Sequence, residues 1–138
     1  MPAPANPRRR DYFVYQFKAD GYPFYVGIGH SERASDRLRY VRSLMVPKNV
    51  DKLAEKALSV RVIAALLKRK VEIKFSCTRR PMNRRQALDL ERRTIDRLVA
   101  AGFLLTNWQH NPYRHDDTAR AVRAILRGRR TAGARSRR

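Results

Sequence analysis

The segment over residues 12–29, YFVYQFKADGYPFYVGIG, carries the pattern that decides the fold. Aromatic and β-branched residues fill positions 12–17 and again 24–28, and such residues are typical of β-strands. Asp20 and Gly21 stand between the two runs and favour a turn. We therefore expect the two runs to pair as an antiparallel β-hairpin.

The rest of the chain shows helical spacing of apolar residues, interrupted by one further strand pattern. The expected elements are a helix that Ser31 or Ser35 caps and Pro47 ends, a longer helix from Asn49 to about Arg69, a half-buried strand over 71–77, and a helix over 84–101 that Gly102 stops. Three strands interleaved with helices predict a compact α+β fold, in which a small sheet is flanked by helices.

The two ends of the chain differ in composition from its middle. Residues 1–10 contain three prolines and end in three arginines, which predicts a flexible basic arm ahead of the main domain over 11–112. Residues 113–138 are expected to form a basic helix that ends at Gly128 and an arginine-rich tail. The tail has no acidic and no large apolar residue, a composition typical of disorder.

The charge of the chain indicates a polyanionic partner. Its 138 residues include 32 Lys and Arg against 12 Asp and Glu, a formal charge of +20, and 25 of the 32 cations are Arg. The planar guanidinium group matches phosphate oxygens, and this excess is larger than solubility requires. We therefore expect a nucleic acid as the partner.

The composition also excludes several classes of protein. No stretch approaches the roughly 20 apolar residues of a transmembrane helix, and the first ten residues lack the apolar segment of a secretory signal. Cys77 is the sole cysteine, which excludes an intramolecular disulfide and a cysteine-based zinc cluster. These features predict a cytoplasmic, single-domain protein with no membrane partner, and a monomer is the default expectation.

One carboxylate falls on the apolar face of the helix expected over 84–101. At 100° per residue, this face contains Ala87, Leu88, Ile95, Leu98 and Val99, and Glu91 lies within it. A Glu at the border of an apolar face costs free energy unless something pairs with it. Two partners stay open, an Arg in a structural ion pair or a divalent metal that faces a phosphate.

Other residues have the chemistry to contact phosphate groups. Gly27 and Gly29 resemble a loop in which phosphate approaches the backbone, and His30 follows them directly. Three arginines of the C-terminal helix share one face, as a helix that tracks phosphates requires: Arg120, Arg123 and Arg127. Tyr15 and Tyr25 lie near the ends of the two paired strands, where tyrosine is also a common structural residue.

The order of these motifs resembles that of the GIY-YIG nuclease superfamily. The matching stretches are FVY at 13–15 and YVG at 25–27 for the two triplets, YVGIGHSER at 25–33 for the branch with the pattern YVGxGxxxR, ALDLERRTI at 87–95 for the helix with the catalytic Glu, and LLTN at 104–107 for the closing Asn. The resemblance covers residues 11–110.

The branch pattern places the catalytic Arg six residues after the motif Gly, at Arg33. The stretch DRLRY over 36–40 also resembles the Arg-centred helix of other branches, so Arg37 is a second candidate. The chain departs from the family in having Phe13 for the first Gly, and Val replaces Ile in both triplets. Many relatives carry His or Tyr four residues after the Arg, whereas this chain has Arg37 there, with Tyr40 nearby.

The resemblance implies a small three-stranded antiparallel sheet flanked by helices and a metal-dependent endonuclease that hydrolyses phosphodiester bonds in DNA. It implies as catalytic residues Tyr15, Tyr25, Arg33 or Arg37, Glu91 and Asn107. Glu91 would hold one Mg²⁺, for which Mn²⁺ could substitute. Tyr15, with Tyr25, would help to take the proton from the attacking water, and the Arg would neutralise charge on the phosphate.

Two other classes of function stay open at this point. The first is a non-catalytic module that binds DNA or RNA on the same fold, with RNA the less favoured ligand. The second is a structural basic protein of a ribonucleoprotein particle. All three classes accommodate the charge; nicking of a plasmid in Mg²⁺ that Glu91→Ala abolishes while binding is kept would distinguish the enzyme.

Overall fold

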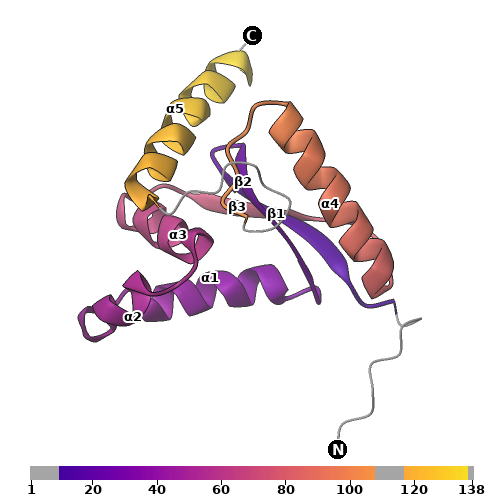
Figure 1. Ribbon diagram of the computed structural model, residues 1–138, viewed down its shortest axis with the longest axis horizontal. Helices are drawn as coiled ribbons and strands as arrows, with labels where there is room; N and C mark the ends of the chain where they lie inside the picture. Colours follow the sequence, from indigo (N-terminus) through magenta and orange to yellow (C-terminus); the bar gives the residue numbers. More distant parts are fainter. Residues whose placement is uncertain (1–9, 108–116, 137–138) are drawn as a thin grey trace, which may run out of the picture.

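The computed structural model describes residues 10–107 and 117–136, with side chains as far as Arg129 (Figure 1). Its elements are β1 (Phe13–Ala19), β2 (Tyr22–Gly29), α1 (Arg33–Leu44), the 3₁₀ helix η1 (Pro47–Asn49), α2 (Val50–Ala54), α3 (Leu58–Lys68), β3 (Ile73–Cys77), α4 (Arg84–Ala100) and α5 (Thr118–Ser136). The arm expected over residues 1–10 lies, apart from Arg10, outside the described residues.

Strands β1 and β2 form the hairpin that the sequence predicts. Asp20 and Gly21 connect them with φ angles of 47° and 85°, the left-handed conformation of a type I′ turn. β1 also pairs antiparallel with β3, so the strand order is β2-β1-β3. The predicted α+β fold, with a small three-stranded antiparallel sheet flanked by helices, is therefore confirmed.

The two faces of the sheet are covered by different helices. Val14 and Val26 face α4 and pack there with buried residues of that helix, including Ile95. Successive side chains of a strand point to opposite faces, so Tyr15 and Phe17 face the other way, toward α1 and α3. Figure 1 shows α4 on one side of the sheet and α1 and α3 on the other.

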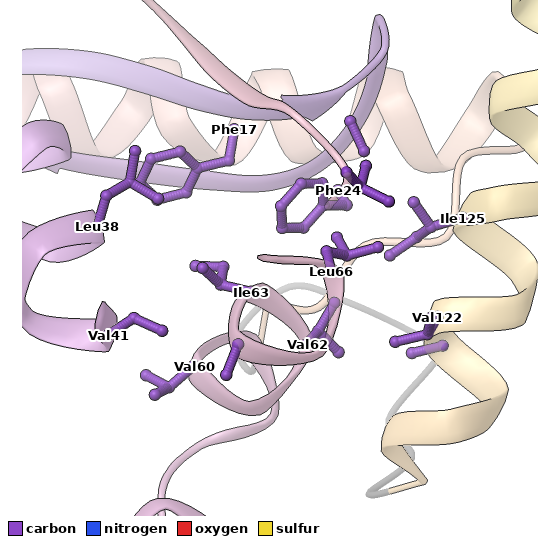
Figure 2. Close-up of a cluster of buried hydrophobic side chains, with 14 of the residues drawn as sticks. Phe17, Phe24, Leu38, Val41, Val60, Val62, Ile63, Leu66, Val122 and Ile125 are labelled. Atoms are coloured by element: carbon purple, nitrogen blue, oxygen red, sulfur yellow. The ribbon is translucent and has the colours of Figure 1, made fainter. Parts of the chain in front are cut away.

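The larger core lies between the sheet and helices α1, α3 and α5. Figure 2 shows its side chains converging from five elements: Phe17 of β1, Phe24 of β2, Leu38 and Val41 of α1, Val60, Val62, Ile63 and Leu66 of α3, and Val122 and Ile125 of α5. Complete burial of such a side chain contributes about 1.5–3 kcal/mol. These contacts hold three helices against one face of the sheet.

Helix α4 begins and ends close to its predicted limits. The Asn83 side chain accepts a hydrogen bond of 2.8 Å from the backbone N–H of Gln86, whose side chain accepts one of 3.0 Å from the Asn83 N–H. This capping box satisfies two N–H groups that the first helical turn leaves without partners. Gly102, with φ of 93°, follows the helix and ends it as predicted.

One residue of the predicted apolar face of α4 is placed wrongly. Leu88 is 37% exposed, because the buried face keeps Ala87, Ile95 and Leu98 but includes Thr94 in place of Leu88. Thr94 is polar, but its hydroxyl donates a 2.7 Å hydrogen bond to the Leu90 carbonyl oxygen, so burial leaves it satisfied.

The predicted caps of the helix after β2 are also wrong. α1 begins at Arg33 with Glu32 as its N-cap residue, and neither Ser31 nor Ser35 caps it. The chain turns into the helix through a backbone hydrogen bond of 2.9 Å from the Arg33 N–H to the His30 carbonyl oxygen. A backbone turn of this kind replaces a side-chain cap.

The single long helix expected from Asn49 to about Arg69 is divided into η1, α2 and α3. Ala57, with ψ of 156°, is extended and starts α3. The Arg61 Nε–H donates a 3.0 Å hydrogen bond to the Lys56 carbonyl oxygen, which stabilises the break. No Gly or Pro marks this position in the sequence, so the break depends on tertiary contacts.

Strand β3 is shorter and more exposed than the pattern over 71–77 predicts. It begins at Ile73, while Val71 is buried before it and donates its N–H to the Leu66 carbonyl oxygen at 3.0 Å. Phe75 is 39% exposed. The apolar residues of β3 are therefore less covered than those of β1, because β3 forms an edge of the sheet.

Helix α5 corrects the prediction for the C-terminal tail. It continues through Gly128 to Ser136, so neither the helix end at Gly128 nor the disorder expected directly after it is found. A Cβ atom at Gly128 would overlap the ring of Tyr22, so this glycine permits close packing instead of ending a helix. Arg129 Nη1 lies 3.1 Å from Asp20 Oδ2 of the hairpin turn. The inner face of α5 belongs to the larger core.

Within the described part of the chain, none of the helices is both long enough and apolar enough to cross a membrane.

Candidate functional site

The two tyrosines of the strand pair lie side by side on the face that α1 covers. Their ring centroids are 6.3 Å apart, and Tyr25 also stacks on Phe17 at 5.8 Å. Tyr15 is only 2% exposed, whereas Tyr25 is half-buried. The hairpin thus fixes both phenols, one in the core and one at its rim.

Gly27 provides the space that the Tyr15 phenol occupies. The two residues are paired across β1 and β2, and a Cβ atom at Gly27 would lie 2.5 Å from both Cζ and Oη of Tyr15. Any larger residue at this position would displace the phenol. The YVGIG stretch is therefore explained by packing between the strands, without a bound phosphate.

We expect the Gly27→Ala variant to be destabilised by about 1–3 kcal/mol, the cost of adding a methyl group to a packed core. Urea unfolding followed by circular dichroism measures this loss. In a double-mutant cycle with Tyr15→Leu, which removes the overlapping ring atoms, the penalty at Gly27 should largely disappear. An equal penalty in both backgrounds would show that Tyr15 does not cause it.

Arg33, the first residue of α1, covers the Tyr15 phenol. The Arg33 guanidinium group lies close enough to the phenol to lower its pKa. A Cβ atom at Gly29 would lie 2.5 Å from Cγ of Arg33, so this second glycine lets the arginine stem pack against β2. The Arg33 side chain itself is exposed. Its guanidinium group is therefore both in contact with Tyr15 and accessible to a ligand.

Arg37 lies one turn further along α1 and is held differently. Its guanidinium carbon is 4.5 Å from the ring centroid of Tyr25, a cation–π contact, and its Nη2 donates a 2.9 Å hydrogen bond to Ser59 Oγ of α3. The side chain is half-buried. The structure thus brings both candidate arginines to the tyrosine pair, Arg33 at Tyr15 and Arg37 at Tyr25.

A pocket opens between α1 and α3 beside these arginines. Its volume is about 390 Å³, within the range of roughly 300–1,000 Å³ of ligand sites. Five residues line it: Arg33, Asp36, Arg37, Tyr40 and Val60. We call it the α1–α3 pocket. It combines two guanidinium groups with one carboxylate, one phenol ring and one apolar side chain.

Burial keeps the phenol of Tyr15 protonated. Desolvation, the largest cause, and the neighbouring Tyr25 together raise the pKa of Tyr15 from 10.0 to about 12. Arg37 and Arg33 lower the pKa, but by less than burial raises it. At neutral pH the Tyr15 side chain is therefore a neutral hydroxyl, which can both donate and accept a hydrogen bond.

This raised pKa predicts a loss of stability in alkali. As the pH rises above 10, the unfolded chain loses the Tyr15 proton first, whereas the folded protein keeps it until about pH 12. The free energy of unfolding should therefore fall between these values, by roughly 2–3 kcal/mol in total. Urea unfolding at several pH values measures it, and Tyr15→Phe should show a smaller fall by that amount. Equal alkaline losses in both proteins would contradict the assignment.

Glu91 lies half-buried on α4, one turn before the buried Ile95, as the sequence predicts. α4 packs against β2 and β1 on the face opposite to Tyr15. The structure thus brings the phenols and the arginines together on one face and places Glu91 on the helix of the other. Among residues 10–107 and 117–129, no three His, Cys, Asp or Glu side chains gather as a metal-binding group. Glu91 would hold a metal as a single carboxylate.

Asn107 closes the outer edge of β2. Its Oδ1 accepts a 3.0 Å hydrogen bond from the Val26 N–H, and its Nδ2 donates one of 2.7 Å to the Val26 carbonyl oxygen. The neighbouring Thr106 donates its N–H to the Phe24 carbonyl oxygen at 2.7 Å. The side-chain amide of Asn107 therefore substitutes for a peptide group of a fourth strand. It positions the strand that carries Tyr25 and does not touch the tyrosine rings through these bonds.

The other residues expected at phosphate lie on the surface. His30 is exposed, stacks on Tyr12 with centroids 5.9 Å apart, and has its Nδ1 3.7 Å from Asp11 Oδ2. Three arginines on the outer side of α5 are exposed: Arg120, Arg123 and Arg127. Both groups are accessible to a nucleic acid.

Three residues of this site have no role in the sequence-based prediction, Asp36, Ser59 and Val60, and Tyr40 has none either. Ser59 is 22 positions from Arg37 and has no motif around it. Tyr40 is 46% exposed, so its ring is uncovered on α1, but only the structure shows this. Only the packing of α3 against α1 shows that these residues share a pocket.

We compared the chain with protein-family models, with curated proteins and with solved structures. None of them matches it.

Proposed function

We propose that the protein is a metal-dependent endonuclease that hydrolyses phosphodiester bonds in DNA. The observation that carries the proposal is the contact between the Tyr15 phenol and the accessible guanidinium group of Arg33, with Tyr25 and Arg37 beside them. A phosphate that binds Arg33 comes next to two phenols, and hydrolysis of a phosphodiester needs charge neutralisation and a proton acceptor at that place.

The proposal assigns a metal to Glu91. Mg²⁺ keeps several waters and is commonly bound by one or two carboxylates together with substrate phosphates, so a half-buried carboxylate on α4 fits its chemistry. Mn²⁺ has the same preference for oxygen and should substitute. When bound, the ion would polarise a phosphate and stabilise the leaving 3′ oxygen. Because α4 packs on the sheet face opposite to Tyr15, this role requires a substrate that reaches both Glu91 and Arg33.

The protein residues would have distinct tasks around the phosphate. Arg33, from its place beside the phenol, would neutralise the charge that grows on the phosphate oxygens. Tyr15 would accept the proton of the attacking water while its own hydroxyl proton passes to solvent, and Arg37 and Arg33, which lower the pKa of this phenol, would favour the transfer. Tyr25 would support the same hydrogen-bond network, and Asn107 would hold β2 in place.

The proposal includes the wider binding surface. Gly27 and Gly29 let the site residues approach β2, and His30 at the end of this strand faces solvent, where it could meet the DNA backbone. The chain would act as a cytoplasmic monomer. One compact site makes one nick for each encounter, so a double-strand break would need a second encounter.

The arginines of α5 should contribute to affinity through phosphate contacts. The triple variant Arg120→Ala, Arg123→Ala, Arg127→Ala should lower the slope of log affinity against log salt concentration by about 2.7, at roughly 0.9 for each lost contact. Fluorescence anisotropy with a labelled duplex at several salt concentrations measures the slope. A variant with the same change of charge elsewhere serves as the control: Lys48→Ala, Lys52→Ala, Lys68→Ala, all exposed. Equal slopes in the two triple variants would show that α5 has no special role.

The test of the proposed function is nicking of a supercoiled plasmid. The purified protein should convert supercoiled DNA to the open circle with Mg²⁺ or Mn²⁺, and EDTA should stop the conversion. Absence of nicking with either metal, while the protein still binds the plasmid, would overturn the proposal.

A second function is favoured by one observation, the near-complete burial of Tyr15. A phenol that is 2% exposed, with a pKa raised to about 12, suits a structural role as well as proton transfer. On this alternative the protein is a non-catalytic module that binds DNA or RNA, and Tyr15 only holds the hairpin. Binding without nicking is its expected result.

A further inference from the structure

The α1–α3 pocket contains more than a phosphate site requires. Arg33 and Arg37 supply positive charge at one side, while Tyr40 and Val60 supply ring and apolar surface. Asp36 adds a carboxylate that can accept hydrogen bonds from N–H groups. A free phosphate or a simple carboxylate would use only the first pair. A ligand that is anionic at one end and flat and apolar at the other would use all five residues.

Arg37 has a donor that the protein does not use. Its Nε is buried and has no hydrogen-bond partner within the described residues, although its Nη2 is bonded to Ser59. A buried N–H without a partner costs about 1–3 kcal/mol. The stacking on Tyr25 and the bond to Ser59 fix the guanidinium group of Arg37 at the pocket wall, where its other N–H groups can donate to an acceptor on a ligand.

Tyr40 offers an aromatic ring at the other end of the pocket. The side chain is 46% exposed, which is unusual for a tyrosine that lines a cavity. The Lys56 Nζ lies over the ring, 5.8 Å from its centroid, and adds a further positive charge. Exposed aromatic rings next to cations are the arrangement on which nucleic-acid bases stack.

We propose that the α1–α3 pocket binds one unpaired nucleotide of the DNA substrate, with its base on Tyr40 and a phosphate oxygen on Arg37. This inference rests on the proposed function, because it assigns a substrate class to the same site. A base within a duplex is stacked and paired on both sides, so it reaches such a pocket only where it is unpaired or turned out of the helix. The preferred substrates are therefore DNA with a bulge, a flap or a single-stranded segment.

The test compares the binding of two DNA duplexes in EDTA, where no cleavage occurs. One is fully paired, and the other carries a single unpaired 2-aminopurine. The wild-type protein should bind the second about tenfold more tightly, and the fluorescence of 2-aminopurine should fall as it stacks. Tyr40→Ala should lose both effects. Tyr40→Phe, which keeps the ring, and Phe75→Ala, which removes an exposed aromatic ring of β3, should keep both.

The outcomes separate this inference from the proposed function. Equal binding of the two duplexes by the wild type, or a preference that Tyr40→Ala retains, overturns the nucleotide pocket even if the plasmid is nicked. A preference for the unpaired base that depends on Tyr40, in a protein that never nicks the plasmid, supports the pocket and overturns the endonuclease. The fluorescence of the wild-type complex requires no variant to fold.

Discussion

The Glu91→Gln variant should lose Mg²⁺-dependent nicking of plasmid DNA by about a thousandfold. A metal that neutralises charge in the transition state contributes several kcal/mol, and each 1.4 kcal/mol is a factor of ten in rate. Gln keeps the size of the side chain at this half-buried position of α4 but removes the charge that holds a cation. The measurement is the initial rate of conversion from supercoiled to open-circular DNA as a function of Mg²⁺ concentration.

The control for Glu91→Gln is Asp96→Ala on the same helix. Asp96 is exposed, so the variant also loses one carboxylate from α4 without disturbing the buried face. It should nick at the rate of the wild type. Binding of the plasmid in EDTA should be equal in all three proteins, which shows that the fold and the basic surface are intact. If Glu91→Gln nicks as fast as Asp96→Ala, Glu91 is a structural residue and the metal proposal is wrong.

Arg33→Ala should mainly lower the nicking rate, whereas Arg37→Ala should mainly lower stability and substrate binding. Arg33→Ala should lower the nicking rate at saturating protein by about 10²–10³, the cost of one lost donor to the transition state. Because the Arg33 side chain is exposed, the melting temperature should change little. This variant also removes one of the two cations that lower the pKa of Tyr15.

Arg37→Ala should instead weaken the fold and the binding of substrate. It removes the bond to Ser59 and the stacking on Tyr25, so a fall of about 1–3 kcal/mol in the free energy of unfolding is expected. Its nicking rate at saturating protein should fall less than that of Arg33→Ala. The reverse result, a larger loss of rate in Arg37→Ala with an unchanged melting temperature, would exchange the roles of the two arginines.

The hairpin could be predicted because its signals are local. The two aromatic runs and the Asp20–Gly21 turn are close in sequence, and a type I′ turn needs the backbone angles that these two residues tolerate. The limits of α4 were predictable for the same reason. The division between α2 and α3 was not, because the extended Ala57 has no turn residue beside it and depends on contacts with distant segments.

The continuation of α5 shows that a glycine can either end a helix or lie within one where the helix packs closely against another element. Gly128 is typical of a helix end, yet here it is the point at which α5 crosses the Tyr22 ring. Whether Gly128 ends α5 or permits this packing depends on Tyr22 of β2, which lies more than a hundred positions earlier in the chain. In the site, the order of motifs predicted that Tyr15, Tyr25 and an arginine belong together. The pocket beside them could not be predicted, since its walls come from α1 and α3.

The hydrogen bonds of Thr106 and Asn107 to β2 have a consequence for self-association. They occupy the backbone groups of Phe24 and Val26 that an unprotected border strand would offer to another chain. A strand of a second protein molecule therefore cannot pair with these backbone groups of β2. β3 lies at the opposite border, with Lys74 and Glu72 beside its exposed Phe75. We expect that any fibril-like aggregation of this protein begins at β3.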